Sequence, residues 1–315
     1  MTKKRIIFVS TNLAGGGAER VLALLLHHIN LEKYEPYLVV FEEVFHYKIP
    51  EYIPVIQLGK RGWYDFPKLV YRLYNTTSSL KPDVVISFLT YTNIIAVLAK
   101  LSSKLKYKLI ISQHDVPSII ERTDHSIARL VFCKWLPILL YPKADAVICV
   151  SHGVATDVLG YYKVPMNKIK VIHNPIDIDA IKKMSAESIC HPWFSEDIPI
   201  IISAGRLHPI KGFPFLLEAF DSVCKQHHCR LVILGEGPDE NSLKELAHRM
   251  RIDESVLFLG FQENPFKYIS RANIFVFSSL AGEFGNVVKE AAERGEKTAF
   301  IKMAAWINRI RKIET

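Results

Sequence analysis

The feature that most constrains the fold is a recurring pattern of short apolar runs, each followed by a stretch of helical character. Such runs are typical of parallel strands that helices cover on both faces. Because strands alternating with helices form βαβ units, the sequence predicts an α/β protein with doubly wound parallel sheets. The predicted strands are residues 5–10, 36–41, 83–89, 108–113, 145–151 and 170–174, and then 199–205, 230–235, 256–261 and 274–279.

The length of the chain predicts two domains. Its 315 residues are long for one domain, since domains commonly hold about 100–150 residues. A polar, proline-containing segment, residues 174–197, separates the first six predicted strands from the last four. We therefore expect an N-terminal Rossmann-like domain over 1–184 and a C-terminal Rossmann-like domain over 185–315.

The charge is unevenly distributed. Residues 1–184 hold 24 Lys and Arg against 15 Asp and Glu, a net charge of +9, whereas residues 185–315 hold 16 against 17. A basic first half favours an anionic surface or an anionic substrate as the binding partner. Nucleic acid is disfavoured, because the basic residues are dispersed and no nucleic-acid-binding motif accompanies them.

The cysteines and the apolar segments bear on the cellular compartment. The five cysteines are scattered and form no C-x-x-C pair, which favours a reducing, cytoplasmic setting. The sequence enters a predicted strand without a signal-peptide pattern, and Arg129, Lys134 and Pro137 interrupt the most apolar segment, 127–141. That segment predicts either a buried helix or a patch at a lipid surface. We expect a cytoplasmic protein that is either soluble or peripheral on the inner face of the membrane.

Glycines and cations follow several predicted strands, where open α/β sheets bind their ligands. Gly15, Gly16 and Gly17 open a helix that is expected to run to about Ile29, and such a helix start can approach an anion closely. A plain strand-to-helix turn is the alternative. A dinucleotide-binding site, with Glu42 on the ribose, is a weaker alternative because that fingerprint needs a glycine where Arg20 stands.

Two cations follow the first strand of the second half. Arg206 and Lys211 lie five residues apart on a turn, an arrangement that suits a diphosphate. A solvated basic turn is the alternative. Near the C-terminus, Glu283 and Glu290 flank a glycine-bearing loop, and Glu290 can accept two hydrogen bonds from a ribose diol. If this motif stood alone, a solvated helix glutamate would be the favoured interpretation.

Seven motifs occur together in one order: GGGAERV, SHGVATDVL, VIHNPID, SAGRLHPIKGFPFLLEAF, LVILGEGP, LGF and ANIFVFSS…FGNVVKEA. Over about residues 4–295 the chain resembles the family 4 retaining glycosyltransferases of the GT-B fold. The resemblance implies a hexosyltransferase with two Rossmann-like domains facing a cleft, a UDP- or GDP-linked sugar as co-substrate in the second domain, and an acceptor in the first. The implied acceptor is a glycan or a lipid-linked precursor of cell-surface polysaccharide, lipopolysaccharide or capsule.

The resemblance also implies roles for single residues. Arg206 and Lys211 would hold the donor diphosphate, Glu290 the nucleotide ribose, and His114 would lie near the 6-hydroxyl of the sugar. No cofactor and no metal are implied, so Asp177–Asp179 is read as the start of a helix with Asp as its N-cap. The predicted catalytic residues are Arg206, Lys211 and His114, and the predicted donor-binding residues are Gly15, Gly16, Gly17, Gly205, Gly235, Glu236, Glu283, Gly285, Asn286 and Glu290.

The C-terminal part departs from the family pattern. Gly282 and Glu283 stand in transposed order, and the segment after Gly295 differs from the βα units of the family. The sequence therefore predicts a truncated or frameshifted second domain, low solubility, weak or absent transfer, and a second domain more sensitive to protease than the first. The rival interpretations are a sugar-nucleotide epimerase and a non-catalytic sugar-nucleotide-binding protein.

Overall fold

The computed structural model describes residues 2–14, 16–118 and 131–279. The chain divides into two compact units, Met1–Pro175 and a second that starts at Ile176. The sequence-based boundary lies nearby, between residues 184 and 185, and those domain limits stay a prediction.

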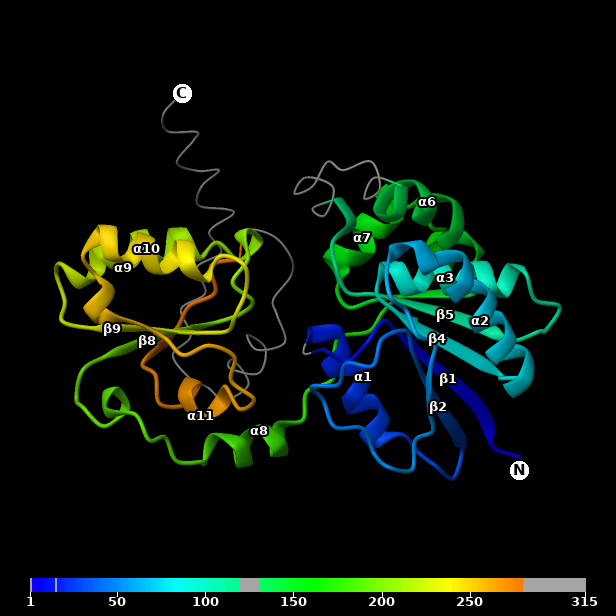
Figure 1. Ribbon diagram of the computed structural model, residues 1–315, viewed down its shortest axis with the longest axis horizontal. Helices are drawn as coiled ribbons and strands as arrows, with labels where there is room; N and C mark the ends of the chain where they lie inside the picture. Colours follow the sequence, from blue (N-terminus) through cyan, green and yellow to red (C-terminus); the bar gives the residue numbers. More distant parts are fainter. Residues whose placement is uncertain (1, 15, 119–130, 280–315) are drawn as a thin grey trace. The chain divides into compact units, whose positions relative to one another are not determined.

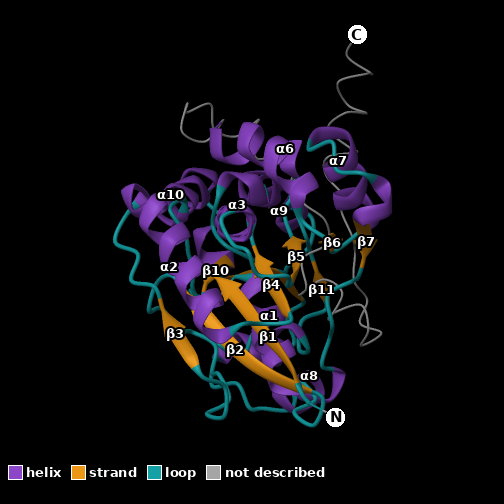
Figure 2. Ribbon diagram, turned by 90° about the vertical axis from the view of Figure 1, so that its right-hand side faces the viewer, coloured by secondary structure: helices purple, strands orange, loops and turns teal. Residues whose placement is uncertain are grey.

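The first unit contains a seven-stranded sheet in the order β3-β2-β1-β4-β5-β6-β7, in which every neighbouring pair is parallel. Figure 2 shows β3 and β7 at its two edges. Six strands confirm the sequence prediction, and the seventh, β3, was missed because three residues are too short to show a pattern. The strands are β1 (Lys4–Ser10), β2 (Tyr34–Val40), β3 (Val55–Gln57), β4 (Val84–Phe88), β5 (Lys108–Gln113), β6 (Ala146–Cys149) and β7 (Ile169–Val171).

Helices cover both faces of this sheet because alternate strand residues point to opposite sides. Ile6 and Phe8 of β1 pack with Leu22 and other residues of α1, whereas Ile7 and Val9 belong to the core under α2 and α3. Figure 1 shows α1 on one side of the strands and α2, α3 and α6 on the other. The helices that the structure describes in this unit are α1 (Gly17–His28), α2 (Phe66–Leu80), α3 (Thr90–Leu101), α6 (Leu136–Leu140) and α7 (His152–Tyr161).

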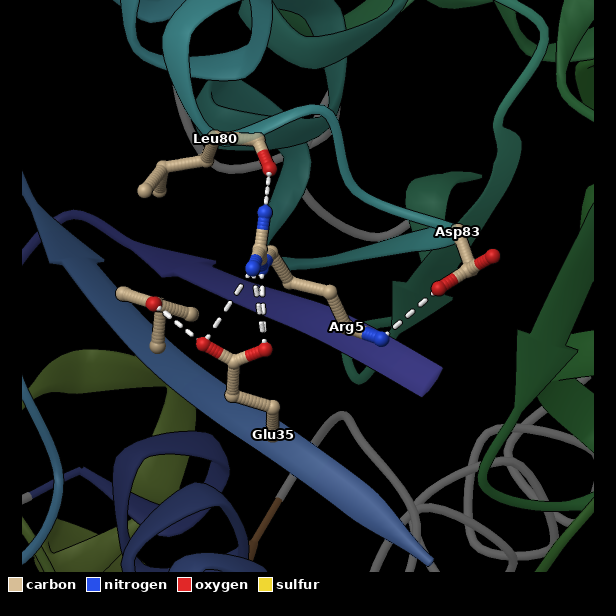
Figure 3. A network of polar contacts seen from close by, with 5 residues as sticks. Arg5, Glu35, Leu80 and Asp83 are labelled. Atoms are coloured by element: carbon tan, nitrogen blue, oxygen red, sulfur yellow. Dashed lines mark hydrogen bonds and ion pairs between the residues drawn. The ribbon is translucent and has the colours of Figure 1, made fainter. Parts of the chain in front are cut away.

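The amino ends of the first strands are fixed by Arg5 (Figure 3). Its guanidinium donates to both oxygens of Glu35 on β2 and to the carbonyl of Leu80 at the end of α2, and its backbone N–H donates to Asp83 over 2.7 Å. Hydrogen bonds from Tyr37 and Arg5 lower the pKa of Glu35. One side chain thus ties β1 to β2 and to the turn that leads into β4, at the edge opposite to the predicted site.

The second unit repeats the design with a four-stranded parallel sheet in the order β10-β9-β8-β11. All four strands confirm the sequence prediction. Figure 1 shows α9 and α10 on one face and α11 on the other. Asp177 accepts a 2.9 Å hydrogen bond from the N–H of Ala180, which confirms it as the N-cap of α8. The elements are α8 (Ile178–Ser185), β8 (Ile200–Ala204), α9 (Phe213–Cys224), β9 (Arg230–Leu234), α10 (Glu240–Met250), β10 (Val256–Phe258), α11 (Phe266–Ile269) and β11 (Ile274–Phe275).

The apolar segment 127–141 is described from Val131 onward. A π-helical turn, Val131–Trp135, leads directly into α6. Pro137 and Leu140 are buried, whereas Trp135 and Leu139 are largely exposed, so the described part of this segment is buried on one side only. The short helix can bury only the side that faces α3. Among the described residues, no helix combines the length and the hydropathy that a bilayer span requires.

Candidate functional site

Each sheet has one place where its strand order reverses, and ligands of open α/β sheets bind there, beyond the carboxyl ends of the strands. In the first unit this switch point lies between β1 and β4, and in the second unit between β8 and β11. The predicted site residues that the structure describes follow β1, β5, β8 and β9, which places them at the switch-point edges of their own sheets.

The first switch point begins with the glycine loop after β1. Gly16 is the N-cap of α1 and Gly17 its first residue, so both lie at the positive end of the helix dipole; Gly15 lies outside the described residues. The carboxylate of Glu19 folds back over this helix start: its Oε2 lies where it would be 2.2 Å from a Cβ placed on Gly16. Burial, and then the nearby Asp115, raise the pKa of Glu19. Nothing in the sequence pattern pointed to this half-buried carboxylate.

Glu42 already has partners in the first unit. Asn12 donates to one carboxylate oxygen over 2.7 Å and the ammonium of Lys60 to the other over 2.5 Å. These contacts speak against Glu42 as the ribose-binding acid of a dinucleotide site. A polar hollow of about 460 Å³ opens beside Glu42 and Lys60, with Arg61 also on its wall.

His114 directly follows β5. Its Nε2 lies 3.0 Å from the hydroxyl of Ser112, and its ring lies 5.7 Å from the ring of Phe88. Burial lowers the pKa of His114 to about 4, so the imidazole is neutral near pH 7. A neutral imidazole can both donate and accept a hydrogen bond, which suits contact with a sugar hydroxyl.

Stability in acid should depend on His114. Because its pKa falls from 6.5 to about 4 on folding, the unfolded chain takes up a proton in this window that the folded chain does not. We expect the free energy of unfolding to fall by about 1–2 kcal/mol between pH 7 and pH 5 through this residue. Urea denaturation at both pH values should show that His114→Gln removes this loss, whereas His227→Gln at an exposed position should not. An unchanged pH dependence in His114→Gln would contradict the assignment.

A buried polar network supports the carboxyl ends of β4 and β5. Asn93, which is fully buried on α3, accepts a 2.7 Å hydrogen bond from the hydroxyl of Ser87 and donates to the carbonyl of Ser112 and the hydroxyl of Tyr141. Tyr141 in turn donates to Gln113 over 2.6 Å. The network fixes the strand that carries His114.

Removal of the central amide should destabilise the first unit. Asn93→Leu leaves the carbonyl of Ser112 and the hydroxyl of Ser87 buried without these partners, and we expect a loss of about 2–4 kcal/mol in thermal or urea unfolding. Asn75→Leu, at an exposed position of α2, is the matched control and should change stability by no more than about 0.5 kcal/mol. Equal stability of the two variants would mean that the network contributes nothing.

Backbone strain marks the same edge. Leu89, between β4 and α3, has φ 71° and ψ 149°. A residue that carries a side chain rarely adopts this backbone conformation, and residues held in it cluster at ligand sites. Leu89 is held there by packing against the core of α1 and by its carbonyl, which accepts from the N–H of Asn93 over 2.9 Å.

In the second unit, the loops after β8, β9 and β10 are joined by backbone hydrogen bonds. Gly205 donates to Leu234 over 2.9 Å, Leu207 to the carbonyl of Glu236 over 2.9 Å, and Gly235 to Gly260 over 2.7 Å. The loops approach so closely that a Cβ on Gly235 would lie 2.0 Å from the carbonyl oxygen of Gly205. This close approach of the two backbones requires a residue without a side chain at position 235, and Gly205 supplies the carbonyl that Gly235 faces.

Arg206 stands at the centre of these loops. Its side chain is exposed, and among the described residues it has neither a hydrogen-bond nor an ion-pair partner. Lys211 ends the turn that follows, where its ammonium lies 5.6 Å from the centre of the Phe277 ring. The two cations thus occur on one rigid loop, and Arg206 is available to bind an anion.

Two serines after β11 hold this loop from the other side of the switch point. Ser278 donates to the carbonyl of Lys211 over 2.8 Å, and Ser279 to that of Ile210 over 3.2 Å. Neither role was predicted from the sequence, although two hydroxyls at the end of a buried apolar run were a usable signal. Glu236 accepts from the N–H of Phe261 over 3.1 Å, so one of its oxygens braces the next loop.

Part of the predicted donor site lies outside the described residues, namely Glu283, Gly285, Asn286 and Glu290. The transposed Gly282–Glu283 pair and the segment after Gly295 also lie there. The expectations that rest on them stay predictions.

Comparison with known protein families shows to which family this chain belongs. The model of Glycosyltransferase Family 4 matches residues 15–180, and that of Glycosyl transferases group 1 matches residues 191–296. The chain belongs to the family 4 glycosyltransferases. The resemblance drawn from the motifs is thereby confirmed.

Two curated relatives show how far the similarity extends. The chain is 31% identical over 287 residues to N-acetylgalactosamine-N,N'-diacetylbacillosaminyl-diphospho-undecaprenol 4-alpha-N-acetylgalactosaminyltransferase of Campylobacter jejuni, covering 89% of this chain and 76% of the relative. It is 30% identical to an uncharacterized glycosyltransferase of Methanocaldococcus jannaschii, covering 71% of this chain and 56% of the relative. The glycosyltransferase thus spans about three quarters of one relative's length and about half of the other's.

Solved structures support the fold. HepE of Anabaena, in complex with UDP and glucose, matches with a TM-score of 0.73 at 19% identity, covering 94% of this chain and 80% of that one. At this identity the likeness concerns the fold alone. Together with the two parallel sheets, it confirms the predicted GT-B class of this glycosyltransferase.

Proposed function

We propose that this glycosyltransferase moves a hexose from a nucleotide-sugar donor to a lipid-linked glycan acceptor, with retention of the anomeric configuration. The observation that carries the proposal is the exposed Arg206 on a braced loop at the switch point of the second unit. In sugar transfer, the leaving diphosphate gains negative charge as its bond to the anomeric carbon breaks. A guanidinium fixed beside it stabilises that charge most where the bond is breaking.

The cations have separate roles in this proposal. Arg206 donates two parallel hydrogen bonds to diphosphate oxygens, which the planar guanidinium allows. Lys211 adds a second positive charge, and the ring of Phe277 beside its ammonium limits where that charge can lie. Glu290 would bind the ribose, and Glu283, Gly285 and Asn286 would surround the sugar.

In the first unit, three features are candidates for substrate binding. We assign His114 to a sugar hydroxyl, since its neutral imidazole is fixed by Ser112 and Phe88. The glycine loop at Gly16 and Gly17 would approach the donor closely, because residues without side chains stand at the positive end of the α1 dipole. The polar hollow beside Glu42 and Lys60 is our candidate for acceptor hydroxyls.

The names of similar proteins support the substrate classes. HepE was solved with UDP and glucose, and the Campylobacter relative is named for transfer of N-acetylgalactosamine to a glycan on diphospho-undecaprenol. We place a UDP-linked hexose or N-acetylhexosamine first among donors and a GDP-linked hexose second. We place a diphosphate-linked lipid glycan first among acceptors, which assigns the protein to cell-surface polysaccharide or lipopolysaccharide synthesis.

Product analysis tests this proposal against its rivals. Purified protein would be incubated with labelled UDP- and GDP-sugars and a membrane extract, with and without a chelator, because we propose that no metal or cofactor takes part. Label in the lipid fraction supports transfer. Free altered sugar would establish an epimerase, and bound but unchanged donor would establish a non-catalytic binding protein.

A further inference from the structure

An exposed apolar face lies on the first unit, in a segment that holds none of the residues proposed for catalysis. Val131, Trp135 and Leu139 follow one another at intervals of four residues through the π-helical turn and α6. Their exposed fractions are 39%, 61% and 64%. Residues four apart share one side of a helix, so the three side chains form one surface, which we call the Trp135 face.

The opposite side of this segment anchors it firmly. Phe132 packs edge-on against Phe66 at 5.1 Å between ring centres, and Pro137 and Leu140 are buried. The hydroxyl of Tyr162 donates to the carbonyl of Cys133 over 2.8 Å. Figure 1 shows α6 beside α3, with α7 close by. The Trp135 face therefore points outward from a rigid support, and its exposure does not arise from a loosely held segment.

The surroundings of the face are strongly basic. Residues 98–108, 131–143 and 161–170 together contain nine lysines and no Asp or Glu. The first two segments meet where α3 contacts α6. The last two meet where Lys168 donates to the carbonyls of Pro142 and Ala144, and where the ammonium of Lys134 lies 5.6 Å from the ring of Tyr161. Asp145, which follows segment 131–143 in the sequence, forms an ion pair with Lys100. The net charge around the face is thus positive.

We propose that the Trp135 face docks the first unit onto an anionic lipid bilayer. Trp135 and Leu139 would enter the boundary between headgroups and acyl chains, where tryptophan is favoured, and the surrounding lysines would contact anionic headgroups. An exposed apolar strip with a basic surround matches the two attractions that such a surface offers. The inference does not depend on the proposed reaction, because it rests on exposure and charge alone.

Vesicle flotation of the full chain tests the docking. Wild-type protein should float with vesicles of phosphatidylglycerol and phosphatidylcholine, bind weakly to phosphatidylcholine alone, and dissociate as salt is raised. The double variant Trp135→Ser/Leu139→Ser should bind the anionic vesicles roughly 10- to 100-fold more weakly. The control is Tyr71→Ser, which removes an equally exposed side chain from α2, 64% against 64% for Leu139, and should bind like wild type.

The charge and the fold are tested separately. Lys104→Glu/Lys106→Glu should weaken binding to anionic vesicles about tenfold or more and leave binding to neutral vesicles unchanged. Circular dichroism and thermal unfolding should match wild type for all variants, since every altered side chain is exposed. Wild-type affinity in the Trp135→Ser/Leu139→Ser variant would overturn the proposal. So would a dimer in sedimentation that this variant abolishes, because the face would then bind a second copy of the chain.

Discussion

Replacement of Arg206 by alanine is expected to weaken donor binding roughly 10- to 100-fold, because a lost charge-assisted hydrogen-bond pair costs about 1.5–3 kcal/mol. The side chain is exposed, and its loop is held by backbone bonds and by Ser278, so the fold should survive the change. Titration calorimetry with UDP and with the UDP-sugar measures the effect. Turnover should fall at least as much, since the charge on the diphosphate grows as the sugar leaves.

Two further variants sharpen this result. Arg206→Lys keeps the charge but loses the planar fork, so its donor affinity should lie between those of wild type and Arg206→Ala. Arg249→Ala removes an exposed arginine from the end of α10, outside the switch-point loops, and should bind the donor like wild type. Unchanged affinity in Arg206→Ala, or an equal loss in Arg249→Ala, would refute the diphosphate assignment.

Replacement of Gly235 by alanine is expected to damage the second unit most severely. Gly235 has φ 128°, and a Cβ there would lie 2.0 Å from the carbonyl oxygen of Gly205. Since neither backbone can give way without breaking the bonds between the loops, we expect a loss of roughly 2–4 kcal/mol in urea unfolding. Donor affinity should fall as well, because the displaced backbone adjoins Arg206.

A second glycine provides the control for this prediction. A Cβ on Gly160 in α7 would meet nothing within 4 Å. Gly160→Ala should therefore be neutral or stabilising by about 0.5–1 kcal/mol, as expected inside a helix. If Gly235→Ala proved as stable as Gly160→Ala, the close approach of the two loops would be wrong.

Much of this architecture can be predicted from sequence, because parallel strands and their βα turns are local. Continuous apolar runs located ten strands, and the residues after them located the switch-point edges without knowledge of the strand order. Glycine at position 235 and a cation at position 206 are likewise visible in a short window. The strands that were missed or shortened, such as Val55–Gln57, carry too few residues for a period to emerge.

The rest depends on contacts between distant segments. Asn93 and Tyr141 meet although 48 residues separate them, and Ser278 reaches Lys211 across 67. Nothing near Asn93 in the sequence distinguishes it from a solvated helix residue. The exposure of Trp135 could not be predicted either, because a short apolar helix has the same sequence pattern whether one side or all sides are buried. Only the packing of α6 on α3 decides between them.

The most direct test of the proposed function compares two products of one reaction. Purified protein, a UDP-linked sugar and a diphosphate-linked lipid glycan would be combined, and released UDP and glycosylated lipid would be counted together. We predict one UDP for each sugar transferred, with the anomeric configuration of the donor kept in the product. We also predict that Arg206→Ala lowers both yields in step while Arg249→Ala lowers neither. UDP released without glycosylated lipid, or wild-type transfer in Arg206→Ala, would contradict the proposed function.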